Sequence, residues 1–279
     1  MAKFVAVRLT KNNIQNPIAF SCYEQNSREG ENYVEHHTLQ FQVTGTLTLF
    51  DGKESYLSQK GGFQLVRRNQ LMKFFKRPEK NEPFQSLSIY LSLDFLRSFA
   101  REQAIKVESQ AVYPPVVNLY KNDLLDSYLQ SVQVYAHSNE IQDSAIVNAK
   151  LKEGLLLILK RNPEVAQILF NFSEPYKIDL QSFMEENFMF NVQIDRFAYL
   201  TGRSLAAFKR DFKQEFGVPP GRWLTKRRLE EAHKILSGTH KTASEIYIDL
   251  GFEDLSHFSH AFKRQYGIPP SGMKDKGFG

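Results

Sequence analysis

The sequence has few of the features that mark secreted, metal-binding or membrane proteins. Only one of its 279 residues is a cysteine, Cys22, which excludes an internal disulfide and a cysteine-rich zinc site. Residues 1–4 lack the long apolar stretch of a secretory signal, and the longest apolar run, residues 155–159, falls far short of the ~18 residues of a membrane span. We therefore expect a cytoplasmic protein with no membrane segment.

The sequence also lacks a strong excess of positive or of negative charge. The chain carries 36 Lys and Arg against 31 Asp and Glu, a formal net charge of +5, and residues 181–279 hold 15 against 12. Bulk charge alone therefore does not identify a nucleic-acid partner, so that case must come from where the charges lie. A hydrophobic share of 42% excludes a disordered chain. At roughly 100–200 residues per domain, the length predicts two domains.

The first part of the chain, up to residue 95, has the pattern of β-strands. Segments 46–50 and 84–91 are short and rich in β-branched, aromatic and aliphatic residues, and Asp51-Gly52 follows the first of them. Asp-Gly between two such runs predicts a tight hairpin, because glycine tolerates the positive φ that the turn requires. Several strands this closely spaced predict a sandwich or barrel.

Helical spacing replaces this pattern from Ser92 onwards. Apolar residues recur every three or four positions in segments 93–100, 124–135 and 146–158, and Ser92 is expected to be the N-cap of the first helix. The two longer helices, between residues 115 and 160, can belong to the core of their own domain or form an interface between two copies of the chain.

An internal repeat dominates the last third of the sequence. Residues 208–220 match residues 258–270 at a constant offset, and aromatic residues, a lysine, a glycine and two prolines coincide. Such self-similarity predicts a duplicated structural unit. A polar stretch with Pro175 precedes the repeat and is expected to be a linker. The predicted linker spans residues 172–177 and separates the predicted domains 1–172 and 173–279.

Each copy of the repeat has the pattern of a helix that follows a tight turn. Aromatic residues at i, i+4 and i+8 predict one buried stripe, together with Leu205 in the first copy and Leu255 in the second. Gly217 and Gly267 stand where a helix end requires positive φ, and the prolines after them prevent continuation. Helix, tight turn, helix is the helix-turn-helix pattern, whose second helix enters the DNA major groove. The short helices expected before the two copies span residues 192–200 and 243–250.

The outward side of each second helix is expected to be polar. Donor-rich faces opposite aromatic stripes suit DNA phosphates and purine edges. A single such face is more often plain solvated surface, but its duplication within a helix-turn-helix frame favours DNA contact. One helix over residues 220–237 is expected to join the two copies, and its basic run 226–228 predicts both phosphate contacts and internal ion pairs. The outward residues are Ala206, Lys209, Arg210 and Lys213 in the first copy and Ser256, His257, His260, Lys263 and Arg264 in the second.

These residues resemble the DNA-binding module of the AraC/XylS family of transcription regulators. The resemblance rests on segments 201–213, 228–236 and 246–270. It implies two helix-turn-helix units joined by a linker helix, with a recognition helix of each in successive major grooves. Carried over by position, it implies that bases are read by Ala206, Lys209, Arg210, Ser256, His257 and His260. We expect phosphate contacts from Arg203, Ser204, Lys213, Lys226, Arg227, Lys263 and Arg264.

Two residues depart from the family pattern. Tyr247 stands where the family usually has a small alanine, which puts the packing of that short helix in doubt. Ala206 is too small to read a base edge other than a thymine methyl, which weakens the selectivity expected of the first copy.

The N-terminal part resembles the cupin-like regulatory domains of the same family. Residues 59–69 are similar to the subgroup typified by ExsA, an activator of type III secretion genes, in which the regulatory domain dimerises and a protein partner rather than a sugar can control it. The resemblance implies a homodimer through the helices in 115–160 and a regulatory protein or small molecule as effector. The fold class expected is α+β, with a cupin-like β-barrel and flanking helices before an all-α module.

Enzyme chemistry has little support in the sequence. His36 and His37 are adjacent, so on a strand their side chains point to opposite faces and cannot bind one metal. Cys22 has no clustered ligand to activate it, and we expect a buried structural thiol. We therefore expect no catalytic residue, no metal and no cofactor. The predicted function is a sequence-specific activator that binds double-stranded promoter DNA; the alternative is a signal- or partner-sensing cupin-like protein with weakly specific, architectural DNA binding.

Overall fold

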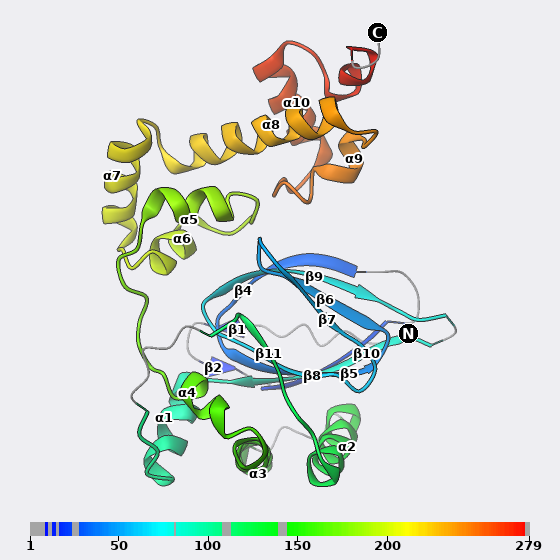
Figure 1. Ribbon diagram of the computed structural model, residues 1–279, viewed down its shortest axis with the longest axis vertical. Helices are drawn as coiled ribbons and strands as arrows, with labels where there is room; N and C mark the ends of the chain where they lie inside the picture. The colour runs from blue at the N-terminus through cyan, green and yellow to red at the C-terminus, as the bar shows by residue number, and fades with distance from the viewer. Residues whose placement is uncertain are drawn as a thin grey trace. The chain divides into compact units, whose positions relative to one another are not determined.

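The chain divides into two compact units, which span residues 1–173 and 174–279. The computed structural model describes residues 9–10, 13–14, 17–23, 28–80, 82–107, 113–138 and 144–276. The N-terminal unit combines β-sheets with helices, and the described part of the C-terminal unit is helical (Figure 1). The predicted α+β fold, with a β-rich first region and a helical second region, is confirmed.

The N-terminal unit contains two antiparallel sheets and one short strand pair. The first sheet has the order β11-β8-β5-β10-β3, and the second has the order β4-β9-β6-β7. Neighbours in sequence are often not neighbours in a sheet, so the chain crosses between the two layers. The strands are β1 (Leu9–Thr10), β2 (Asn13–Ile14), β3 (Ile18–Tyr23), β4 (Arg28–Val34), β5 (His37–Thr44), β6 (Thr46–Phe50), β7 (Ser55–Ser58), β8 (Phe63–Val66), β9 (Gln70–Arg77), β10 (Phe84–Leu91) and β11 (Val116–Asn118).

The hairpin predicted at Asp51-Gly52 joins β6 to β7. Asp51 Oδ1 accepts hydrogen bonds from the backbone N–H groups of Lys53 (2.8 Å) and Glu54 (2.7 Å), so the side chain closes the turn. Gly52 has a φ of +101°. Phe50 then pairs with Ser55 at the start of the returning strand, which confirms the prediction.

Three helices pack with the first sheet to form the main core of this unit. They are α1 (Leu93–Glu102), α2 (Asp123–Ser138) and α3 (Ser144–Arg161). Ser92 caps α1 as predicted, since its Oγ accepts from Phe95 N at 3.2 Å. Tyr128 of α2 lies so close to Gly154 of α3 that a Cβ there would stand 2.3 Å from the tyrosine oxygen. The core residues include Leu39, Leu65 and Leu87 from the sheet and Leu96, Phe99, Leu125, Leu129, Leu151, Leu155 and Ile158 from the helices.

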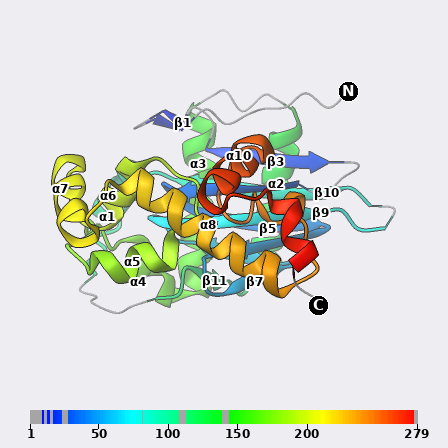
Figure 2. The same cartoon turned by 90° about the horizontal axis from the view of Figure 1, so that it is seen from above.

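The C-terminal unit is built around one long helix. Helix α8 (Pro220–Gly238) confirms the joining helix predicted for residues 220–237. It has α7 at one end and α9 and α10 at the other (Figure 1), and Figure 2 shows α7 at one end of α8 from above. The other helices are α5 (Leu180–Asn187), α6 (Ile194–Leu200), α7 (Leu205–Phe216), α9 (Ala243–Ile246) and α10 (Leu255–Tyr266), followed by the 3-10 helix η2 (Pro270–Lys276).

Candidate nucleic-acid interface

The two copies of the sequence repeat form equivalent structures, which we name the first repeat (α6 and α7) and the second repeat (α9 and α10). The N-terminal cap of α7 is Ser204, whose Oγ accepts from Ala207 N at 3.2 Å. Asp254 caps α10 in the same way through His257 N at 2.6 Å. Both helices end on glycines in the left-handed region, Gly217 at φ +72° and Gly267 at φ +75°. The predicted twin helices with glycine ends are confirmed.

The aromatic stripes face the interior of the C-terminal unit. Phe208, Phe212, Phe258 and Phe262 are all 0% exposed. The third aromatic of each stripe, Phe216 or Tyr266, is half-buried at the helix end.

The leucines expected to extend these stripes lie outside them. Leu205 and Leu255 are 40% and 37% exposed, so the prediction that they point inward is wrong. Each is the first residue of its helix, and in each repeat the buried side of the helix begins at the phenylalanine three positions later.

The six residues expected to read bases are all exposed, in two groups of three. Their side chains come from the N-terminal and middle turns of α7 and α10, which are the parts of a recognition helix that reach base edges. The phenylalanines of the same two helices are buried, so exposed and buried positions are separated within each helix. They are Ala206, Lys209 and Arg210 on α7, and Ser256, His257 and His260 on α10.

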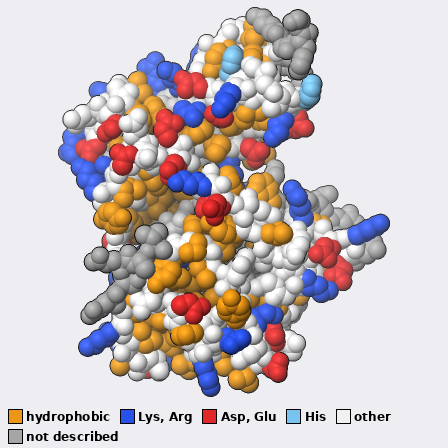
Figure 3. Space-filling view, viewed as in Figure 1, with side chains coloured by type: hydrophobic (Ala, Val, Ile, Leu, Met, Phe, Trp, Pro, Cys, Tyr) orange, Lys and Arg blue, Asp and Glu red, His pale blue; other side chains and the backbone are white. Residues whose placement is uncertain are grey.

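Five of the seven residues expected to contact phosphate are also exposed. Lys226 lies 3.7 Å from Glu230 with both side chains largely exposed, so this pair leaves the lysine accessible to an anion. On the face drawn in Figure 3, Lys and Arg side chains are interspersed with Asp and Glu, in keeping with the near balance of charge in the sequence. The five exposed residues are Ser204, Lys213, Lys226, Lys263 and Arg264.

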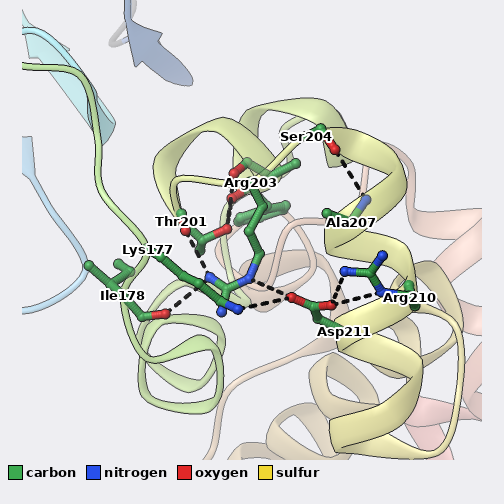
Figure 4. A network of polar contacts seen from close by, with 10 residues as sticks. Lys177, Ile178, Thr201, Arg203, Ser204, Ala207, Arg210 and Asp211 are labelled. Atoms are coloured by element: carbon green, nitrogen blue, oxygen red, sulfur yellow. Dashed lines mark hydrogen bonds and ion pairs between the residues drawn. The ribbon is translucent and has the colours of Figure 1, made fainter.

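Arg203 does not fit the role of a phosphate contact. Its side chain is 8% exposed, and its Nη1 donates to the carbonyls of Ile178 (3.0 Å) and Thr201 (2.8 Å). Its Nε donates to Asp211 Oδ2 at 3.3 Å (Figure 4). Arg203 therefore holds the turn of the first repeat against the preceding segment, and its hydrogen-bonding capacity is largely used inside the protein.

Arg227 is likewise engaged within the C-terminal unit. Its side chain is 25% exposed and pairs with Glu185 at 2.9 Å and with Glu231 at 3.2 Å. Its guanidinium also lies over the ring of Phe188, 4.2 Å from the centroid. Arg227 is therefore a member of the basic run 226–228 that forms internal ion pairs. A phosphate group would have to compete with Glu185 and Glu231 for its guanidinium.

Arg228 binds three backbone carbonyls at once, a role that the sequence did not reveal. Its Nε donates to Phe188 O at 2.7 Å, its Nη2 to Phe190 O at 2.9 Å and its Nη1 to Gly251 O at 2.8 Å. Phe188 and Phe190 lie just before the first repeat, and Gly251 is the turn glycine of the second. We name this arrangement the Arg228 clasp. The available signal was an arginine among the buried positions of α8, next to Leu229 and four residues after Leu224.

The short helix of the second repeat is shorter than predicted. Helix α9 ends at Ile246, whereas the sequence predicted a helix to residue 250, and turns fill residues 247–251. Gly251 has φ +80°, and a Cβ there would stand 2.8 Å from the carbonyl oxygen of Met189. Tyr247, the residue that departs from the family pattern, packs partly buried against the core of this repeat.

The described residues hold no group of three or more His, Cys, Asp or Glu side chains able to bind a metal ion. His37 is 3% exposed, and burial, with Arg68 adding to it, lowers its pKa to about 3.

Cys22 is partly exposed, with Gln85 Nε2 at 3.7 Å, so the expectation of a buried thiol is wrong. The described helices include none that is both long and apolar enough to cross a membrane.

Two family models match the chain, one within each of its two units. Residues 37–169 match a family model described as the ExsA N-terminal regulatory domain, and residues 197–276 match one described as a helix-turn-helix domain. The virulence regulon transcriptional activator VirF of Yersinia enterocolitica is 27% identical over 248 residues, which cover 85% of this chain and 89% of that one. The transcriptional regulator ExsA of Pseudomonas aeruginosa is 26% identical over 236 residues, or 82% of each chain.

A solved structure also aligns with most of the chain. Apo ToxT from Vibrio cholerae covers 96% of this chain and 100% of its own, at 12% identity and a TM-score of 0.46. The two family models and the sequence relatives agree with the motifs of the repeat, with its twin capped helices and with the joining helix α8. The chain belongs to the AraC/XylS family of DNA-binding transcription regulators.

Proposed function

We propose that this protein is a sequence-specific activator that places α7 and α10 in successive major grooves of promoter DNA. The observation that carries the proposal is the duplication of an exposed polar helix face at the two ends of α8. A helix of 19 residues spans about 28 Å, which is close to the ~34 Å between equivalent points on successive turns of B-DNA. The names of the relatives VirF and RhaS, both transcriptional activators, favour activation.

Within this proposal, the exposed residues divide into two roles. Base edges are read by Ala206, which can contact a thymine methyl, and by five residues with hydrogen-bonding side chains. Phosphates are bound by the exposed set on the helix ends and on α8, whereas Arg203 and Arg227 are left out because their guanidinium groups bind acceptors inside the protein. The five base-reading residues besides Ala206 are Lys209, Arg210, Ser256, His257 and His260.

The N-terminal unit is proposed to be a cupin-like domain that controls the protein and joins two copies of it. Several large apolar side chains of α2 and α3 are exposed although the rest of these helices forms the core: Leu124 (58%), Val134 (70%), Ile146 (41%) and Leu156 (47%). Exposed apolar positions on two adjacent helices favour a homodimer through residues 115–160. Sedimentation at several concentrations tests this, and a monomer at every concentration would exclude it.

The effector of the N-terminal unit is proposed to be a regulatory protein or a small molecule. The match of residues 37–169 to a regulatory domain supports control through this unit. A comparison of DNA binding by the full chain and by residues 174–279 would show the size of that control.

Selection of bound sequences from random duplexes tests the proposed function. We expect one enriched motif with two separated contact regions, bound at least about 10³-fold more tightly than random duplex. Lys209→Ala or Arg210→Ala is expected to remove base preference in one region without unfolding the protein. Lys80→Ala, which removes an exposed charge from the N-terminal unit outside residues 115–160, is the matched control. Absence of any enriched motif would favour the architectural binder instead.

A further inference from the structure

An acidic side chain lies within the proposed reading face of α7. Asp211 Oδ1 accepts from Arg210 through both Nε (3.2 Å) and Nη2 (3.0 Å). Its Oδ2 accepts from the Nε of Arg203, and Lys177 Nζ lies 3.6 Å from the same oxygen. Figure 4 shows the carboxylate between the two guanidinium groups. Neighbouring residues on a helix do not face each other, so Arg210 must bend along the helix to make this contact.

The contact with Asp211 uses the N–H donors on one edge of the Arg210 guanidinium and leaves the donors on a second edge accessible. Nε and Nη2 form the side edge of the fork, and both donate to Asp211. The end edge, formed by Nη1 and the second N–H of Nη2, keeps its donors. A pair of parallel donors is the group that binds O6 and N7 of guanine. Because the Arg210 side chain is 74% exposed, this edge is accessible from outside.

The carboxylate of Asp211 is itself held in place by Arg203. Arg203, which is 8% exposed, binds the carboxylate and is held by two backbone carbonyls. The Asp211 side chain is 19% exposed. Hydrogen bonds from Arg210 first, and from Arg203 second, lower the pKa of Asp211, so the group is ionised at neutral pH. A chain of fixed contacts thus runs from the turn of the first repeat to the guanidinium of Arg210.

The second repeat has no equivalent of this chain. Fifty positions after Asp211 stands Ala261, which is buried, and the positions equivalent to Arg203 and Arg210 hold Glu253 and His260. Arg203 also holds the turn of the first repeat against the preceding segment. Arg210 and Asp211 are not needed for the fold of a repeat, since the second repeat forms the same caps and the same phenylalanine stripe without them. Their presence in one repeat alone points to a role at its surface.

We propose that Asp211 is a positioning residue, which orients the guanidinium of Arg210 for a guanine in the major groove. This inference rests on the proposed function, in which α7 reads bases. Asp211 does not contact DNA; it acts by restricting the conformations of a long flexible side chain before binding. Restricting one such side chain is worth about a 2- to 10-fold difference in equilibrium.

The test is a binding-site selection with the full chain and three variants. Arg210→Ala should lose guanine preference at one position by about 5- to 100-fold. Asp211→Asn keeps the shape but removes the charge, and should reduce preference at that same position by about 2- to 10-fold while other positions keep theirs. The double variant should lose no more than Arg210→Ala alone. Glu215→Gln, which removes an exposed charge one turn further along α7, should keep the wild-type preference.

The outcomes separate this inference from the proposed function. If Arg210→Ala keeps the wild-type motif, α7 does not read bases through Arg210 and the proposed function fails at that helix. If Arg210→Ala loses preference but Asp211→Asn keeps it, only the positioning role is overturned. A structural role for Asp211 alone predicts a lower thermal midpoint and equal weakening at all positions. Arg203→Lys, which loses the fork but keeps the charge, should reproduce a part of the Asp211→Asn effect and gives a second route if that variant folds poorly.

Discussion

Helices α7 and α10 share an interior and differ at the surface. Both have twelve residues, an N-cap side chain, a pair of fully buried phenylalanines and a left-handed glycine at the end. At the surface, α7 presents Lys209 and Arg210, whereas the equivalent residues of α10 are Ser259 and His260. Where α7 has Asp211, α10 has the buried Ala261. Packing constrains the inward positions, because a core tolerates little change of volume. The outward positions carry no such constraint, so under the proposed function the two copies of one fold bind two different base sequences.

The shared interior is most strongly tested at its phenylalanines. Phe212→Ala and Phe262→Ala should each lower the free energy of unfolding by about 3–5 kcal/mol, because each side chain is 0% exposed and its loss leaves a cavity. Urea unfolding of the full chain measures both. Leu205→Ala, at a position 40% exposed, is the control and should change little. A loss at only one of the two phenylalanines would show that the interiors are not equivalent.

The difference at the surface is tested by His260→Ala beside Arg210→Ala. Each should cost about 1–3 kcal/mol of discrimination at its own base position, because each removes one set of hydrogen bonds to a base edge. Their effects should add in the double variant, since distant sites are independent. Competition binding with single-base variants of the selected duplex measures this. Both variants changing the same base position would contradict two separate reading helices.

The two helix ends provide a smaller and matched comparison. Gly217→Ala and Gly267→Ala should each destabilise the protein by roughly 1–2 kcal/mol, because a side chain is strained at φ +72° and +75°. A Cβ at either position has no neighbour within 4 Å, so strain alone sets the cost and the two losses should be equal. Thermal melts of the two variants give the comparison. Unequal losses would mean that one end is held differently in solution.

The smallest expected effect concerns phosphate binding by Lys213 and Lys263. These exposed lysines occupy equivalent positions in the last turns of α7 and α10. Replacing either with alanine should weaken binding to all duplexes alike and reduce the slope of log affinity against log salt by about 1. Titrations at several salt concentrations measure the slope. A change in base preference at either site would move that lysine from the phosphate set to the reading set.

The regular parts of the C-terminal unit could be predicted from the sequence. Aromatic spacing, glycine ends and the internal repeat identified α7, α10 and the joining helix, because these signals depend on residues near in sequence. The fold class of the N-terminal unit and the hairpin at Asp51-Gly52 followed from similar local patterns. Where a local pattern was extended too far, as at Leu205 or at the end of α9, the prediction failed.

The roles of the arginines could not be predicted, since they depend on partners distant in sequence. Arg203 reaches back to Ile178, and Arg228 reaches 23 residues forward to Gly251. A buried arginine and an exposed one look alike in a sequence, so the sequence predicts a phosphate contact for both Arg203 and Arg227. Asp211 carries a charge opposite to that of the basic face that the sequence predicts, and this mismatch was the one available signal of its role.

The Arg228 clasp has a consequence for the promoters that this protein can use. The guanidinium binds the segment between α5 and α6 and the turn of the second repeat, so a rotation of the second repeat relative to that segment would break charged hydrogen bonds in a buried place. We therefore expect the protein to bind only promoters in which the two contact regions have one fixed spacing and lie on the same side of the DNA. Half a turn of duplex, about five base pairs, inserted between the two contact regions would carry the second region to the opposite side of the DNA, out of reach.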